Sequence, residues 1–264
     1  MSRSTWDAFV SGEDPSGHGA EIYSDAGELA ESVAAFLATG FEGGEAGLVV
    51  ATPEHVVAIT DALAARGWDA PAIDSSPQLL VSDAETTLEA ILVDGALSAE
   101  AFVRVVGGLI DDLAGRPLRI FGEMVDLLTR RGRVDEALAL EALWNDLQLT
   151  RDFSLLCGYG LDIFDLSVQA GPLPSVCRVH SHVLPAHDDT RFRSAVERAL
   201  FEVLGPTKAR DVLYIVGGTL REKRVPVAQD ALRWVTANMP AKADRILTLA
   251  RSLYASGPAY AASA

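Results

Sequence analysis

The sequence predicts an α/β fold in which a mostly parallel, doubly wound sheet is followed by a small all-α module. Continuous apolar runs such as Ala46–Ala51 and Leu118–Phe121 are typical of strands that are covered on both faces. Segments with helical spacing of apolar residues separate these runs, and this alternation favours parallel strands. From Pro185 onward the pattern contains four helical segments and no strand, which predicts the C-terminal module.

Capping residues and glycines set the limits of the first elements. Asp25 and Glu28 form a capping box that begins a helix, and Gly40 is expected to end this helix in the left-handed conformation. After the strand at 46–51, Thr52 is expected to cap a second helix, with Pro53 at its first position.

The middle of the chain continues the same alternation. A second capping box, Ser82 to Glu85, begins one helix, and Ser98 caps the next, which carries a clear apolar stripe. The elements predicted here are strands at 78–81, 118–121, 153–157 and 175–183, and helices at 82–93, 98–113, 124–132 and 135–149.

Three regions follow from these patterns. Residues 1–17 are rich in Gly, Ser, Pro and acids and are expected to form a flexible arm, with Trp6 and Phe9 able to dock. Residues 18–186 are predicted to form the α/β domain, and residues 187–264 the helical C-terminal domain. The helices expected in the last region are 192–204, 209–216, 227–238 and 243–254.

Composition excludes several classes of protein. With 264 residues, 49% hydrophobic and 22% charged, the chain can bury a sizeable core. No apolar run approaches the ~20 residues that span a bilayer, and the N-terminus lacks the apolar core of a secretory signal. The two cysteines, Cys157 and Cys177, do not make a disulfide framework, so we expect a cytoplasmic protein.

The net charge of −15 is unevenly distributed. Residues 188–264 contain 12 basic and 8 acidic residues, a net charge of +4, which leaves −19 for the rest of the chain. An acidic front half repels nucleic acid and anionic membranes. The basic run Arg221, Lys223 and Arg224 is expected to be a solvated helix end, and no recognition helix is identifiable. We therefore expect no membrane contact and no direct nucleic-acid binding.

The segment from Phe36 to Asp69 is similar to the one after the phosphate loop in the circadian-clock-ATPase branch of the RecA-like fold. Such ATPases carry a Gly-rich GKT or GKS turn before this segment. The corresponding stretch here, His18 to Asp25, has no lysine and lacks the matching glycines. Nucleotide binding thereby loses its backbone cradle and its cation for the β and γ phosphates.

Further motifs extend the resemblance to a specific family. They are Gly122-Glu123-Met124, Glu141-Ala-Leu-Trp144-Asn145, Cys157-Gly-Tyr159 and Cys177-Arg-Val-His180-Ser-His182. With these motifs the chain resembles the MEDS sensory domain, found in methanogen and methylotroph regulators, over about residues 16–186. This resemblance implies a sensor of small hydrocarbon derivatives on a degenerate ATPase-like fold.

Ligands of open α/β sheets bind beyond the carboxyl ends of the strands, and several polar residues are expected there. By the resemblance, His18 and Tyr23 occupy the former phosphate-loop turn. Glu123 follows a buried strand, where burial raises the pKa of a carboxyl unless a cation or a hydrogen-bond donor offsets it. The six residues expected to line the ligand crevice are His18, Tyr23, Glu123, Trp144, Tyr159 and His182. Each also has a simpler interpretation, which for Trp144 is a place in the core.

A metal site is the alternative interpretation of the histidines. On a strand, Cys177 would face away from His180 and His182, because odd and even positions point to opposite faces. The two histidines would share a face, and a tetrahedral site would need further ligands, of which Cys157 could be one. We therefore assign no metal and no cofactor from the sequence, and no hydrolase motif is present.

These observations predict a small-molecule sensor in signal transduction or transcriptional control, without ATPase activity. The helical C-terminal domain is the expected contact for a protein partner, and homo-oligomerisation stays open. Two alternatives remain: a nucleotide-binding RecA-like enzyme with an aberrant phosphate loop, and a ligand-free interaction adaptor.

Overall fold

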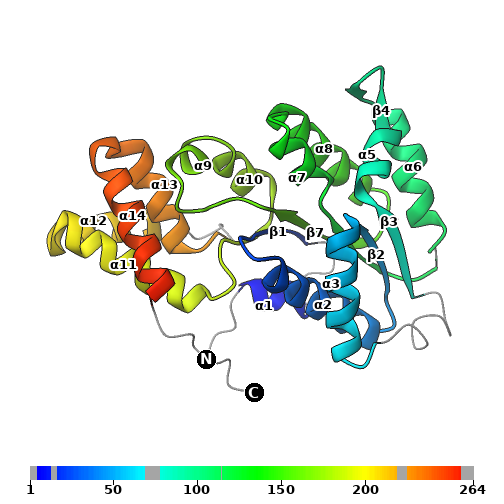
Figure 1. Ribbon diagram of the computed structural model, residues 1–264, viewed down its shortest axis with the longest axis horizontal. Helices are drawn as coiled ribbons and strands as arrows, with labels where there is room; N and C mark the ends of the chain where they lie inside the picture. The colour runs from blue at the N-terminus through cyan, green and yellow to red at the C-terminus, as the bar shows by residue number, and fades with distance from the viewer. Residues whose placement is uncertain (1–4, 13–16, 69–77, 114, 219–224, 257–264) are drawn as a thin grey trace. The chain divides into compact units, whose positions relative to one another are not determined.

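The computed structural model describes residues 5–12, 17–68, 78–113, 115–218 and 225–256 of the chain (Figure 1). The chain divides into two compact units, Met1–Gly160 and Leu161–Ala264. This division lies N-terminal to the predicted domain boundary at residue 186. Among the described residues, no helix has the length and apolar character that crossing a membrane requires.

The first unit alternates strands and helices, as the sequence predicts, with one extra strand and a short hairpin. Its elements are α1 (Thr5–Val10), β1 (His18–Ile22), α2 (Ala26–Glu42), β2 (Ala46–Ala51), α3 (Pro53–Ala65), β3 (Leu79–Asp83), α5 (Ala84–Ile91), β4 (Leu92–Val93), β5 (Ala96–Leu97), α6 (Ala99–Asp111), β6 (Leu118–Gly122), α7 (Met124–Arg130), α8 (Val134–Gln148) and β7 (Phe153–Tyr159).

Five strands of this unit form a parallel sheet in the order β3-β2-β6-β7-β1. Helices cover both faces (Figure 1). Two glycines show which helices lie on which face. A Cβ on Gly47 of β2 would meet side chains of α2, and Gly122 of β6, which is aligned with Val50 of β2, lies against Trp144 of α8. Positions 47 and 50 point to opposite faces because their separation is odd, so α2 and α8 cover opposite faces of the sheet. The prediction of a parallel α/β fold is therefore confirmed.

The N-terminal segment is folded where the structure describes it, so the flexible arm expected there is wrong for residues 5–10. Phe9 is fully buried and stacks on Phe36 of α2, with ring centroids 5.2 Å apart. Arg119, buried on β6, donates hydrogen bonds to the carbonyl oxygens of Val10 (2.5 Å) and Phe36 (2.9 Å). These contacts tie α1 to α2 and the sheet. The composition of the segment does not reveal them.

Gly40 does not end the helix that contains it. It lies inside α2, and the left-handed conformation occurs at Gly44, with φ of 81°. A Cβ on Gly40 would lie 2.6 Å from Cδ of Arg119, so the glycine provides space for the buried arginine rather than a stop.

The second unit is mainly helical. Its elements are α9 (Leu166–Ala170), α10 (Leu173–Val179), β8 (His182–Leu184), α11 (Asp189–Leu204), α12 (Pro206–Gly218), α13 (Val227–Asn238) and α14 (Pro240–Ser256). Helices α11 to α14 pack against one another, which confirms the predicted C-terminal helices. The basic run at 221–224 lies outside the described residues.

The strand predicted at 175–183 is wrong for most of its length. Residues up to Val179 form α10, and only His182–Leu184 form a strand. The buried residues of α10 are Leu173, Val176 and Cys177, which have the spacing of one helical face. This face, together with Pro172 at the N-cap and Pro174 in the first turn, outweighs the β-branched composition of the segment.

Candidate functional site

The sheet has a topological switch point between β2 and β6. These strands are neighbours, but the chain leaves β2 toward β3 on one side and leaves β6 toward β7 on the other. The helices that follow them, α3 and α7, lie on opposite faces (Figure 1). Open α/β sheets bind ligands at the carboxyl ends of such a strand pair.

Glu123 occupies this switch point. It is 1% exposed, and its carboxylate accepts hydrogen bonds from the backbone N–H of Thr52 and from Nδ1 of His55, the latter at 2.5 Å. Burial opposes ionisation, but these donors outweigh burial, so the pKa of Glu123 lies below its ordinary value. The hydrogen bond to Glu123 raises the pKa of His55. The two residues therefore favour a charged pair, and the Glu123 carboxylate does not cap α7.

A second buried carboxylate, Asp126, lies one turn further along α7. It pairs with Nε of Arg130 at 2.7 Å, accepts the N–H of Gly160 at 2.8 Å and accepts the Tyr23 hydroxyl at 3.3 Å. Arg130 also donates to the Tyr23 hydroxyl oxygen at 2.9 Å. Burial raises the pKa values of both Asp126 and Tyr23.

An edge-on contact between the rings of Tyr23 and His55, with centroids 5.6 Å apart, joins the two carboxylate groups. We call this assembly the edge cluster; its members are Tyr23, His55, Glu123, Asp126 and Arg130. It combines two carboxylates with two cationic groups, so its charges are matched internally.

The former phosphate-loop position is a short connection. Strand β1 ends at Ile22 and α2 begins at Ala26, so Tyr23, Ser24 and Asp25 alone connect them. The Asp25 carboxylate accepts hydrogen bonds from the N–H groups of Gly27 (2.8 Å) and Glu28 (2.9 Å). The predicted cap is confirmed. It occupies the helix N-terminal N–H groups that a phosphate would use.

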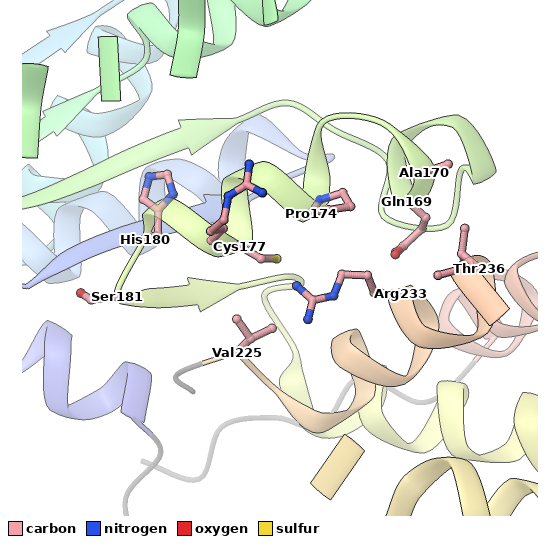
Figure 2. Close-up of a pocket in the computed structure, with 11 residues that line it drawn as sticks. Gln169, Ala170, Pro174, Cys177, His180, Ser181, Val225, Arg233 and Thr236 are labelled. Carbon is pink, nitrogen blue, oxygen red and sulfur yellow. The ribbon is translucent and has the colours of Figure 1, made fainter. Parts of the chain in front are cut away.

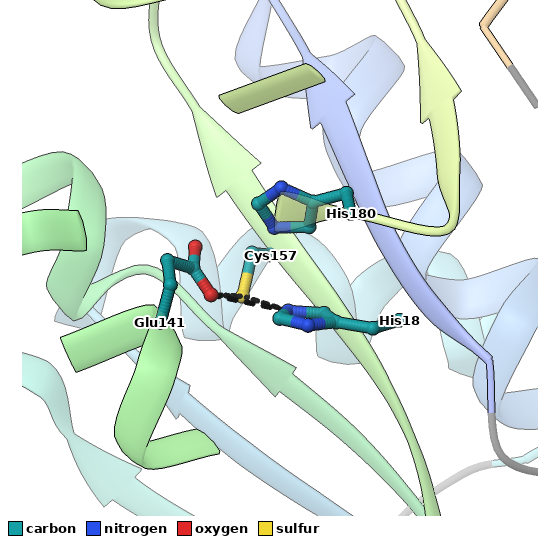
Figure 3. A group of neighbouring side chains, drawn as sticks. All are labelled: His18, Glu141, Cys157 and His180. Carbon is teal, nitrogen blue, oxygen red and sulfur yellow. Dashed lines mark hydrogen bonds and ion pairs between the residues drawn. The ribbon is translucent and has the colours of Figure 1, made fainter. Parts of the chain in front are cut away.

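His18 does not lie in this turn, contrary to the prediction. It begins β1, a strand that the sequence pattern does not reveal, and it is buried among side chains of α8 and β7 (Figure 3). Its Nε2 lies 3.1 Å from Glu141 Oε2 and 3.4 Å from Cys157 Sγ, and its Nδ1 lies 2.9 Å from Asn145 Oδ1. Tyr159 donates its hydroxyl hydrogen to the other carboxylate oxygen of Glu141.

The remaining predicted residues lie elsewhere. Trp144 is 1% exposed and packs edge-on against Phe102 and Phe153, with centroids 5.1 and 6.1 Å away, as a core residue does. His182 belongs to β8 in the second unit, with Nδ1 3.0 Å from the Ser181 hydroxyl. Because Cys177 lies on α10, the strand alternation expected for Cys177, His180 and His182 does not apply.

Of the predicted residues, the structure brings Tyr23 and Glu123 into the edge cluster, and His18 and Tyr159 into the group around Glu141. Sequence reasoning assigns no site role to His55, Asp126 or Arg130. The sequence contains one signal for two of them. His55 lies three positions after Thr52, the first residue beyond β2, and Asp126 lies three positions after Glu123, the first residue beyond β6. A residue in the first turn of each following helix returns to the same edge of the sheet.

The second unit contains a cavity of about 1000 Å³ (Figure 2). Helices α9 and α10 supply one wall, with Gln169, Pro174 and Cys177, and α13 supplies another, with Arg233 and Thr236. The full lining is Gln169, Ala170, Pro174, Cys177, Arg178, His180, Ser181, Val225, Arg233, Thr236 and Ala237.

Comparison with known proteins gives one family. The family model described as the methanogen/methylotroph, DcmR sensory domain (MEDS) matches residues 17–180, more than half of the chain. No curated protein matches the chain.

Proposed function

Because this chain belongs to the MEDS family of sensory domains, we propose that it senses a small molecule held in the cavity between α9, α10 and α13, without ATP turnover. The family assigns a sensory role. The identity of the site and the absence of nucleotide chemistry are our proposal. The cavity is the observation that carries it.

The size and lining of the cavity suit a small ligand with an apolar body and one anionic group. A volume of about 1000 Å³ is at the upper end of the range for small-molecule sites. Ala170, Pro174, Val225 and Ala237 provide apolar surface. Arg233, whose side chain is 27% exposed, provides a guanidinium that pairs with Asp230 at 2.6 Å and still reaches the cavity.

One polar group of the lining needs a partner. The Thr236 hydroxyl oxygen is buried and makes no hydrogen bond within the described part of the chain. An unsatisfied buried hydroxyl costs about 1–3 kcal/mol, and a ligand oxygen or nitrogen would recover that free energy. Thr236 therefore gives the cavity a specific contact in addition to apolar surface.

The position of the cavity suits signal transmission. Its first wall, α9 and α10, belongs to the segment that matches the family, whereas α13 belongs to the C-terminal helices. Gln169 of α9 and Gln229 of α13 already exchange hydrogen bonds of 3.0 and 3.5 Å. A ligand that contacts both walls differently in two arrangements would shift their populations and alter what α11–α14 present to a protein partner.

The absence of ATP turnover is supported by the connection between β1 and α2. A triphosphate there would meet the Asp25 carboxylate on the N–H groups of α2, and no lysine lies in the connection. The nearby Arg130 is already paired with Asp126. Repulsion between like charges opposes nucleotide binding at this edge.

The test uses 1-anilinonaphthalene-8-sulfonate, a fluorescent probe with an apolar ring system and one anionic group. We expect saturable fluorescence enhancement with the full chain and loss of that signal in Ala237→Trp, which fills the cavity from an exposed position. The matched control is Ala241→Trp, at an exposed position on α14 outside the lining, and it should keep the signal. Equal signals from both variants would overturn the cavity as the ligand site.

Calorimetric titration with MgATP tests the nucleotide alternative. We expect no saturable binding below a dissociation constant of about 1 mM, which corresponds to about −4 kcal/mol. Saturable binding in the micromolar range would instead favour the RecA-like enzyme. Native mass spectrometry of the purified chain completes the test, since a retained small molecule that Ala237→Trp excludes would identify the natural ligand.

A further inference from the structure

The side chains of His18, Glu141 and Cys157 direct three metal-ligating atoms toward one point inside the first unit (Figure 3). The residues come from β1, α8 and β7, and their exposed fractions are 3%, 0% and 0%. We propose that these three residues form a binding site for one divalent transition metal ion of the zinc type. The proposal is independent of the small-molecule cavity and departs from the expectation of no metal drawn from the sequence.

The distances between the donor atoms fit one face of a zinc tetrahedron. Zinc bonds to nitrogen, oxygen and sulfur place adjacent donors about 3.4 Å apart for nitrogen and oxygen, and about 3.6 Å apart when one is sulfur. Here Nε2 of His18 lies 3.1 Å from Glu141 Oε2 and 3.4 Å from Cys157 Sγ, and the sulfur lies 3.7 Å from the same carboxylate oxygen. A metal ion can therefore enter with shifts of a few tenths of an ångström.

The groups behind these donors orient them as metal ligands. Asn145 Oδ1 lies 2.9 Å from Nδ1 of His18 and can only accept, so Nδ1 carries a hydrogen. In the neutral ring this leaves the lone pair on Nε2, the atom that faces Glu141 and Cys157. Tyr159 donates to Glu141 Oε1 and leaves Oε2 directed at the other two donors. Metal-binding histidines and carboxylates usually have such partners.

Charge balance favours the same conclusion. A Cys157 thiolate and a Glu141 carboxylate carry two negative charges, which a divalent ion would neutralise in this buried site. Metal binding would form the Cys157 Sγ–metal bond and release the thiol proton to solvent.

The donor set indicates the kind of metal. One imidazole, one thiolate and one carboxylate suit zinc or cobalt(II) better than magnesium or calcium, which prefer oxygen ligands alone. Three protein donors leave one tetrahedral position for water or another donor. The edge cluster is a poorer candidate, because His55 and Arg130 already pair with its carboxylates.

The experiment measures metal in the full chain, expressed without a histidine tag in zinc-supplemented medium and purified without chelator. We expect about one zinc per chain by inductively coupled plasma mass spectrometry, falling at least fivefold in Cys157→Ser and Glu141→Gln. The control is Cys177→Ser, which changes the other buried cysteine, in the second unit, and should leave the zinc content unchanged.

A spectroscopic measurement covers the case in which Cys157→Ser fails to fold. Cobalt(II) added to the metal-free wild-type chain should give a thiolate-to-cobalt charge-transfer band and tetrahedral ligand-field bands. Wild-type protein that is folded by circular dichroism, contains no zinc and gives no such band would overturn the proposal. Zinc content that Cys157→Ser leaves unchanged in a folded chain would overturn it as well. Either failure leaves the probe-binding test of the cavity unaffected, because the two sites share no residue.

Discussion

His55 Nδ1 lies 2.5 Å from the Glu123 carboxylate, although 68 positions separate the two residues in the sequence. The contact joins the first turn of α3 to the N-cap residue of α7; these two helices follow adjacent parallel strands and lie on opposite faces of the sheet. Each partner favours the charged form of the other, because the pKa of His55 is raised and that of Glu123 is lowered.

The His55–Glu123 pair should make the stability of the first unit depend on pH. Because the folded-state pKa of His55 is raised above 6.5, its protonated form stabilises the fold fully at pH values below 6.5. This contribution is lost as the pH rises through the folded pKa. A lowered glutamate pKa stabilises the fold above 4.5, and this contribution is lost as the pH falls through the folded pKa. The difference in unfolding free energy between wild type and His55→Gln should therefore be largest between these values, at about 1–3 kcal/mol.

Urea denaturation at several pH values measures this difference. Glu31→Gln, which removes an exposed ion pair with Arg66, should cost less than about 1 kcal/mol and serves as the control. Parallel stability curves for wild type and His55→Gln across the whole range would show that the pair contributes no charge-dependent stability.

Glu21 should destabilise the folded protein as the pH rises, whereas the His55–Glu123 pair stabilises it. Its carboxyl group lies inside β1, 1% exposed, with Oε2 lacking a hydrogen-bond partner among the described residues, and burial raises its pKa to about 8. The unfolded chain loses this proton near pH 4.5, so stability falls as the pH rises from there to about 8. Glu21→Gln should remove this fall and stabilise the protein at pH 8 by on the order of 3–5 kcal/mol.

Guanidinium denaturation at pH 5 and pH 8 separates the effect of the buried Glu21 from the effect of removing any one carboxylate. Glu54→Gln, at an exposed position on α3, should leave the pH dependence as in wild type. If wild type and Glu21→Gln lose the same free energy between the two pH values, Glu21 is not the buried acid responsible.

Much of the fold could be predicted because its strands carry continuous apolar runs and its helices carry caps. Ala46–Ala51, Leu118–Phe121 and the cap at Asp25 are cases in which local pattern and tertiary burial agree. Strand β1 could not be found this way. Its sequence is HGAEI, which has no apolar run. The burial of His18 depends on hydrogen-bond partners distant in the sequence, and the burial of Glu21 depends on its carboxyl group being protonated, and no local pattern contains either.

The candidate sites show the same limit. Glu123 could be placed at the carboxyl end of a strand, because a residue that directly follows a strand must lie there, whereas Tyr23 is placed by the family resemblance alone. Glu141 could not be assigned to His18 and Cys157, since their proximity depends on how α8 crosses β1 and β7. The cavity of the second unit does not follow from the sequence pattern, because the composition of 175–183 predicts a strand and so leaves no helical wall opposite α13.

Trp144 tests whether a residue predicted at the site belongs to the core. Its indole ring contacts two phenylalanines at 1% exposure, so Trp144→Ala should destabilise the first unit by about 3–5 kcal/mol. Leu149→Ala, at a residue that is 83% exposed, should change the free energy of unfolding by less than about 0.5 kcal/mol. Thermal unfolding of both variants gives the comparison, and a loss below about 1 kcal/mol for Trp144→Ala would contradict the core assignment.

Two glycines inside helices should respond in opposite directions to the same substitution. Alanine is favoured over glycine in a helix interior by about 0.5–1 kcal/mol. At Gly108 of α6 a Cβ would meet no atom within 4 Å, so Gly108→Ala should stabilise the protein by about that amount. At Gly40 of α2 the Cβ would lie 2.6 Å from Cδ of Arg119.

Arg119 cannot easily move away from such a Cβ, because its guanidinium is bonded to Val10, Phe36 and Glu45. Gly40→Ala should therefore destabilise the protein by about 1–3 kcal/mol, despite the gain in helix propensity. Chemical denaturation of wild type and the two variants under one condition measures both changes in the free energy of unfolding. Stabilisation by both substitutions would mean that the arginine side chain yields at little cost, and the contact of α1 with the sheet would then be looser than these hydrogen bonds indicate.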